Sequence, residues 1–99
     1  MTTSTGHDMS RVTLTDDRGN VHDVTKTARR YVTIRQKAVR ANLTWLASGD
    51  DSLLRKRDDY LFRSVEIVTT IRDLLGHDAS KRFAIEADRV FGPVKFWPE

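Results

Sequence analysis

The sequence predicts an α+β fold that is mostly α: an N-terminal β-hairpin, then a long antiparallel helix pair and a short third helix. Residues 25–47 and 52–75 are of similar length, and each repeats apolar side chains at helical spacing. Before them, a strong turn sequence follows a short alternating segment, which is typical of a hairpin. With 38% hydrophobic residues in a chain of 99, we expect one small domain over residues 11–99 and a disordered arm over residues 1–10.

The hairpin is predicted for residues 11–24. Val12 and Leu14 alternate with threonines and lead into a turn sequence rich in aspartate, where Gly19 can take the required positive φ. A two-stranded ribbon alone is only marginally stable in water, so it must pack on a helix or gain a third strand.

The first long helix is expected to begin with Thr25 or Thr27 as its N-cap and to end near residue 48, where Gly49 can stop it. Its stretch holds six basic residues and no acidic one. Apolar side chains fill most of the circumference, so one side should face the core and the other should carry a basic stripe. Five cations form this stripe, within an arc of about 100°: Lys26, Arg29, Arg30, Lys37 and Arg40.

The second long helix is expected over residues 52–75. Asp50, Asp51 and Ser52 can cap its start, and Gly76 can end it. The short linker makes it an antiparallel neighbour of the first helix. Its apolar residues cover more than half of the circumference, which is more than the first helix alone can cover. We therefore expect it to be the central helix.

A shorter third helix is expected to begin with Asp78 or Ser80 as its N-cap and to run up to the Gly92–Pro93 pair. Residues 94–97, Val-Lys-Phe-Trp, then have the pattern of an extended segment. This segment has two interpretations: the third strand that the hairpin needs, or a hydrophobic strap over the helices.

Known catalytic and metal-binding motifs are absent from the sequence. There is no cysteine, the three histidines lack metal-ligand spacing, and no phosphate-binding glycine loop or GxSxG motif occurs. We expect no enzyme activity, no metal and no cofactor. No apolar run approaches the roughly 20 residues that cross a bilayer, and the N-terminus has no signal-peptide h-region. The expected location is therefore the cytoplasm, without a membrane partner.

Arg35 and Asn42 stand seven residues apart, near the middle of the apolar side of the first long helix. A buried guanidinium needs a partner, because an unpaired charge in a core is very costly. We favour an internal salt bridge, with Glu66 or Glu86 as the acid. In the alternative interpretation, Arg35 and Asn42 face a second subunit, and Phe62 belongs to the same contact surface.

The basic stripe is the strongest functional indication in the sequence. The net charge is only +3, so the signal is the gathering of cations on one helix rather than their total. We expect a small non-enzymatic regulatory or adaptor protein whose stripe contacts an acidic protein surface, with Phe62 as a weaker apolar contact and a homodimer as a further possibility. The alternatives are a nucleic-acid-binding protein that uses the stripe against phosphates, a purely structural subunit, and a stripe that is only a solvated face.

Overall fold

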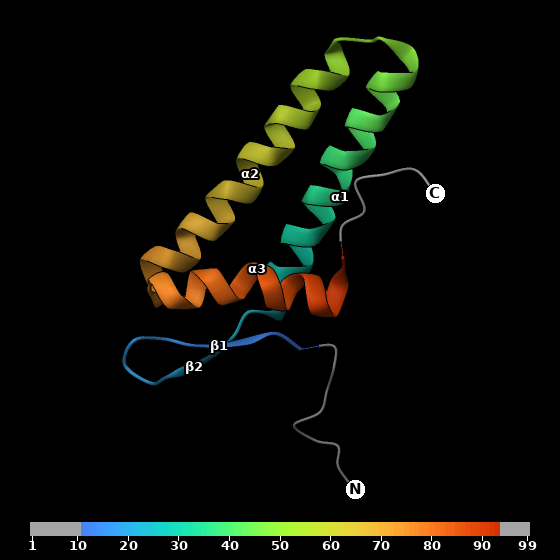
Figure 1. The fold of residues 1–99 in the computed structure, drawn as a ribbon. Coiled ribbons are helices and arrows are strands. Elements are labelled where there is room, and N and C mark those ends of the chain that lie inside the picture. The colour runs from blue at the N-terminus through green and yellow to red at the C-terminus, as the bar shows by residue number, and fades with distance from the viewer. Residues whose placement is uncertain (1–10, 94–99) are drawn as a thin grey trace, which may run out of the picture.

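The computed structural model describes residues 11–93 (Figure 1). The elements in this part of the chain are β1 (Thr13–Thr15), β2 (Val21–Asp23), α1 (Thr25–Ser48), α2 (Ser52–Leu75) and α3 (His77–Phe91). The predicted α+β, mostly α fold is confirmed. The predictions for residues 1–10 and 94–97 lie outside the described residues.

The two long helices form an antiparallel hairpin, and α3 crosses it at the end nearest to the strands (Figure 1). Gly49 ends α1 in the left-handed conformation, with φ 72°, and its N–H donates to the carbonyl of Trp45 at 2.7 Å. Gly76 ends α2 with φ 105°, so both predicted stops are confirmed. Because α3 crosses the pair instead of running along it (Figure 1), α3 covers only one end of the pair.

The strands β1 and β2 pair antiparallel, with Leu14 opposite His22, and Gly19 in the turn has φ 85°. The predicted hairpin and its positive φ are therefore confirmed. The hairpin packs on α3 and contributes Val12 and Leu14 to the core. This packing supplies the apolar burial that a two-stranded ribbon lacks by itself.

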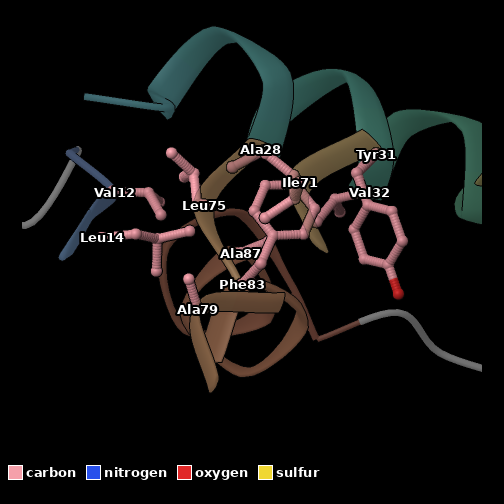
Figure 2. Packing of buried hydrophobic residues seen from close by; sticks show 10 residues of the cluster. All are labelled: Val12, Leu14, Ala28, Tyr31, Val32, Ile71, Leu75, Ala79, Phe83 and Ala87. Atoms are coloured by element: carbon pink, nitrogen blue, oxygen red, sulfur yellow. The ribbon is translucent and has the colours of Figure 1, made fainter. Parts of the chain in front are cut away.

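The hydrophobic core lies where α3 and the hairpin meet the adjacent ends of α1 and α2 (Figure 2). Phe83 is fully buried, and its ring meets that of Tyr31 edge-on, with 5.2 Å between centroids. Ten buried residues make up the cluster: Val12, Leu14, Ala28, Tyr31, Val32, Ile71, Leu75, Ala79, Phe83 and Ala87. The other end of the helix pair lies beyond the reach of this core.

The predicted N-cap of α1 is wrong. The helix begins at Thr25, so Val24 holds the cap position and makes no side-chain cap bond. The hydroxyl of Thr25 instead accepts a hydrogen bond from the backbone N–H of Val12 at 2.9 Å and donates to Asp23 Oδ1 at 2.6 Å. This last bond is the main reason that the pKa of Asp23 is lowered. Thr25 thus joins the start of α1 to the hairpin. This role depends on the packing of the hairpin against the helix, which local sequence does not show.

The start of α2 at Ser52 agrees with the prediction, whereas the start of α3 differs from it. At α2, Asp51 holds the cap position without a side-chain cap bond, while Asp50 Oδ1 accepts from the backbone N–H and the hydroxyl of Ser52 at 3.0 and 2.8 Å. The third helix begins at His77, before both predicted caps, and the hydroxyl of Ser80 donates to the carbonyl of His77 at 2.7 Å. Ser80 is therefore already inside the first turn of α3.

The prediction that the second long helix is central is wrong. Three residues of α2 are buried, against six of α1. Since α3 reaches only the end of α2 near Leu75, much of the apolar surface of α2 stays exposed. Four large apolar side chains of α2 have exposed fractions of 40–73%: Leu61, Phe62, Val65 and Leu74.

Asp16 organises the hairpin turn. Its Oδ1 accepts hydrogen bonds from the backbone N–H groups of Arg18 and Asn20 at 2.8 and 2.9 Å, and its Oδ2 lies 2.7 Å from Nε2 of His22. The bond to His22, followed by that to Asn20, lowers the pKa of Asp16 from 3.8 to about 2. The ionised carboxylate is therefore the form that the folded turn favours.

Replacement of Asp16 by asparagine should have an effect on stability that depends on pH. Because folding lowers the pKa of this carboxyl, its contribution is complete above about pH 4 and is lost as the pH falls toward about 2. We expect Asp16→Asn to lower the free energy of unfolding at neutral pH and to lower it less near pH 2. Urea unfolding followed by circular dichroism measures both losses. Asp17→Asn, at an exposed neighbour, is the control, and equal losses for Asp16→Asn at the two pH values would contradict the role of the ionised form.

Candidate functional site

The exposed side of α1 is the first candidate site. The five predicted cations all have exposed side chains: Lys26, Arg29, Arg30, Lys37 and Arg40. Within residues 11–93 none of them has a carboxylate oxygen within 4 Å. These five residues, which formed the predicted basic stripe, are called the basic face from here on. Its charge is not neutralised by the described part of the chain.

Several carboxylates of α2 and α3 are engaged with cations of their own helices. Asp59 pairs with Arg63 at 2.9 Å, one turn away along α2, and Glu86 pairs with Arg89 along α3. Since α1 has no acidic residue, it cannot form such pairs within itself. The basic face therefore has no acid on its own helix, and no carboxylate of the other described elements lies within 4 Å of it.

Arg29 contacts a neighbouring element. Its guanidinium lies over the ring of Phe91, at 5.1 Å from the centroid, and so connects α1 to the C-terminal end of α3. The side chain is still exposed. This contact reduces the freedom of one cation without neutralising its charge.

An open groove of about 520 Å³ lies beside the basic face, between β2, α1 and α2. Arg30 belongs to both the groove and the basic face, and Arg63 and Glu66 line the groove from α2. Its apolar lining comes from Val24, Ile67, Ile71, Leu74 and Leu75. An apolar floor beside cationic side chains suits an amphipathic segment of another protein. The sequence alone did not reveal this groove, because it depends on how the hairpin sits against the helices.

Arg35 forms the internal salt bridge that the sequence favoured, but with a different acid. Its Nη1 lies 3.7 Å from Oδ2 of Asp88 on α3, and neither Glu66 nor Glu86 is the partner. Glu86 binds Arg89 instead. Which acid of α3 meets α1 depends on the angle at which the helices cross, and helical periodicity does not determine that angle.

Asn42 is also bound within the helix pair. Its side-chain oxygen accepts a hydrogen bond from Nη1 of Arg57 at 2.8 Å, across the interface between α1 and α2. Arg57 was missed by the sequence reasoning. One signal could have found it: in a helical hairpin that turns near residue 50, residues at similar distances from the turn face each other.

Phe62 does not lie with the basic face. It is exposed, and it precedes buried Ile71 by nine residues, which places the two on opposite sides of α2. It is not among the residues that line the groove beside Arg30. The structure brings the five cations together on one helix and leaves Phe62 on a separate apolar surface with Leu61 and Val65.

Among residues 11–93, no three histidine, cysteine, aspartate or glutamate side chains are grouped closely enough to hold a metal ion. None of the helices in this range has the length and hydropathy needed to span a membrane. Comparison of the chain with protein-family models, with curated proteins and with solved structures finds no match.

Proposed function

We propose that this protein is a small non-enzymatic regulatory or adaptor protein that binds an acidic surface of a partner protein through the basic face of α1. The main support is that five exposed cations share one helix and have no carboxylate partner among the described residues. A merely solvated face would be expected to pair some of its cations internally, as α2 and α3 do. An unneutralised row attracts an acidic partner and orients it.

The groove beside Arg30 favours a protein partner over a nucleic acid. Stable protein interfaces combine an apolar centre with a polar rim, and the groove supplies apolar surface next to the cations. Apolar side chains of the partner would fill the groove while its carboxylates meet the basic face. The proposal includes action in the cytoplasm and requires no cofactor.

Phosphate binding by the same basic face is the alternative, and the five unneutralised cations favour it as well. Two features count against it. The opposite side of α1 is buried, so the helix would lie along a nucleic acid backbone rather than deep in a groove. In addition, the exposed positions of α1 between the cations carry no aromatic side chain on which bases would stack.

Charge reversal on the basic face should remove the partner. The experiment captures partner protein from a nuclease-treated native lysate with the tagged chain. We expect the variant Arg29→Glu/Arg30→Glu to capture at least about tenfold less partner than the wild type does, because two attractive charges become repulsive ones. The matched control is Lys81→Glu/Arg82→Glu, at two adjacent exposed residues of α3, which makes the same change in net charge. This control should keep the partner. Circular dichroism checks that both variants are folded.

Nuclease and salt distinguish the two kinds of partner. If capture requires nucleic acid, and purified protein binds DNA or RNA with a log–log salt slope of about −4, the five cations contact phosphates. A protein contact with an apolar centre should weaken much less as salt is raised. Equal capture by the wild type and by both double variants would contradict a role for the basic face.

A further inference from the structure

The second long helix carries another surface, distinct from the basic face. Leu61, Phe62 and Val65 lie exposed on α2. Half-buried Leu54 and Val68 extend the row in both directions, and Val68 also packs against the core. We call these five residues the α2 ridge. In Figure 1, α2 forms one long edge of the molecule, and α3 crosses the helix pair only at its far end. Scattered exposed apolar residues are ordinary, but a contiguous row marks an interface.

The spacing of the α2 ridge is that of a helix-packing seam. Leu54, Leu61 and Val68 are seven residues apart, and Val65 comes four residues after Leu61 and three before Val68. This alternation of four and three keeps the side chains on one line of a helix, where they pack against a second helix. Buried Ser64, Ile71 and Leu75 mark the side of α2 that packs on the rest of the chain, and Val68, which also packs against the core, stands at the margin between that side and the ridge.

Two residues of opposite charge lie on the same line, at equal distances from Val65. Asp58 precedes it by seven residues and Arg72 follows it by seven, so each is about 10 Å from Val65 along the helix. Both side chains are more than half exposed. Their ion pairs are with neighbours in sequence: Asp58 with Arg57 at 2.9 Å, and Arg72 with Asp73 at 3.7 Å. Such exposed pairs contribute little to stability and leave both groups able to meet a further charge.

This arrangement makes the α2 ridge complementary to itself. If a second copy lies antiparallel across it, with a two-fold axis at Val65, Asp58 of each copy faces Arg72 of the other, and the apolar row is buried between them. A parallel arrangement would place Asp58 against Asp58 and Arg72 against Arg72, which repel. An unrelated partner would need no such symmetry of charge about Val65.

We propose that the α2 ridge is the interface of a homodimer in which two α2 helices pack antiparallel about a two-fold axis at Val65. The basic face lies on α1 and stays uncovered in this arrangement, so the dimer presents two of them. Two linked sites bind a partner with paired acidic surfaces more tightly than one site does. The dimer itself does not depend on the proposed function.

A charge exchange across the two-fold axis tests the interface. Sedimentation equilibrium of the full chain, over a range of concentrations, should give a dimer for the wild type. Asp58→Arg alone and Arg72→Asp alone should each weaken the dimer at least about tenfold, because each places like charges together at both ends of the ridge. The combined variant Asp58→Arg/Arg72→Asp should restore the dimer, since opposite charges meet again.

Apolar variants provide the second arm of the experiment. Val65→Glu should abolish the dimer, because two carboxylates would meet on the axis. Ile85→Glu, at a side chain of α3 that is 69% exposed, is the control and should leave the dimer intact. A wild type that is monomeric at all concentrations, a dimer that survives Val65→Glu, or a failure of the charge exchange to restore association would overturn the proposal. Capture of a partner by the basic face is measured separately, so loss of one proposal does not remove the other.

Discussion

Truncation of Phe83 to alanine should destabilise the protein by about 3–5 kcal/mol, the range observed when a large buried ring is removed. Phe83 has an exposed fraction of 0% and lies in the cluster that joins α3 to β1, α1 and α2. Its edge-on contact with the ring of Tyr31 would be lost as well. The neighbours of Phe83 come from four different elements, so they can fill the cavity only in part.

Urea unfolding monitored by circular dichroism measures this loss as a lower midpoint at unchanged slope. Ile85→Ala is the control, because Ile85 stands on the same helix, is also large, and is exposed; its effect should stay within about 0.5 kcal/mol. If Phe83→Ala leaves no folded population, Phe83→Leu, which fills most of the cavity, should give a smaller and measurable loss. Comparable losses for Phe83→Ala and Ile85→Ala would contradict the position of the core.

The helix stops were predictable from the sequence because they depend on local chemistry. Gly49 and Gly76 adopt positive φ values that other residues avoid, so a glycine after a periodic stretch marks a stop wherever the helix packs. The starts of α1 and α3 were not predictable in the same way. Thr25 has a side chain suited to capping, but its hydroxyl is used by Val12, thirteen residues earlier. Local propensity cannot indicate whether a threonine hydroxyl will cap its own helix or bind a backbone group that is distant in sequence.

The candidate site shows the same division between local and tertiary information. The gathering of cations on the exposed side of α1 follows from helical periodicity, which the sequence contains. Their lack of acidic partners depends on where α2 and α3 place their carboxylates. The identity of Asp88 as the partner of Arg35 likewise depends on the crossing of α1 and α3. Exposure of the α2 ridge could not be predicted, because it depends on where α3 crosses the helix pair.

Replacement of Gly76 by alanine should cost about 2–4 kcal/mol. Gly76 has φ 105° and ψ 168°, a region that is essentially restricted to glycine and costs a residue with a Cβ about 1–3 kcal/mol. A Cβ at this position would also lie 2.6 Å from Cγ of Asp17, in the turn of the hairpin. The side chain of Asp17 would then have to move aside, which adds an overpacking cost to the backbone strain. Urea unfolding measures the loss.

Two further variants divide this loss into its causes. Gly49→Ala is the matched control: Gly49 also has a positive φ, but a Cβ there meets nothing within 4 Å, so the cost should be about 1–2 kcal/mol from backbone strain alone. Asp17→Ala/Gly76→Ala removes the carboxylate from the path of the new Cβ and should recover the overpacking part. If Gly76→Ala costs no more than Gly49→Ala, the hairpin turn does not lie against the corner. If the double variant does recover stability, the recovered free energy measures how firmly the hairpin turn packs against Gly76. The same packing positions β2, which lines one side of the groove beside the basic face.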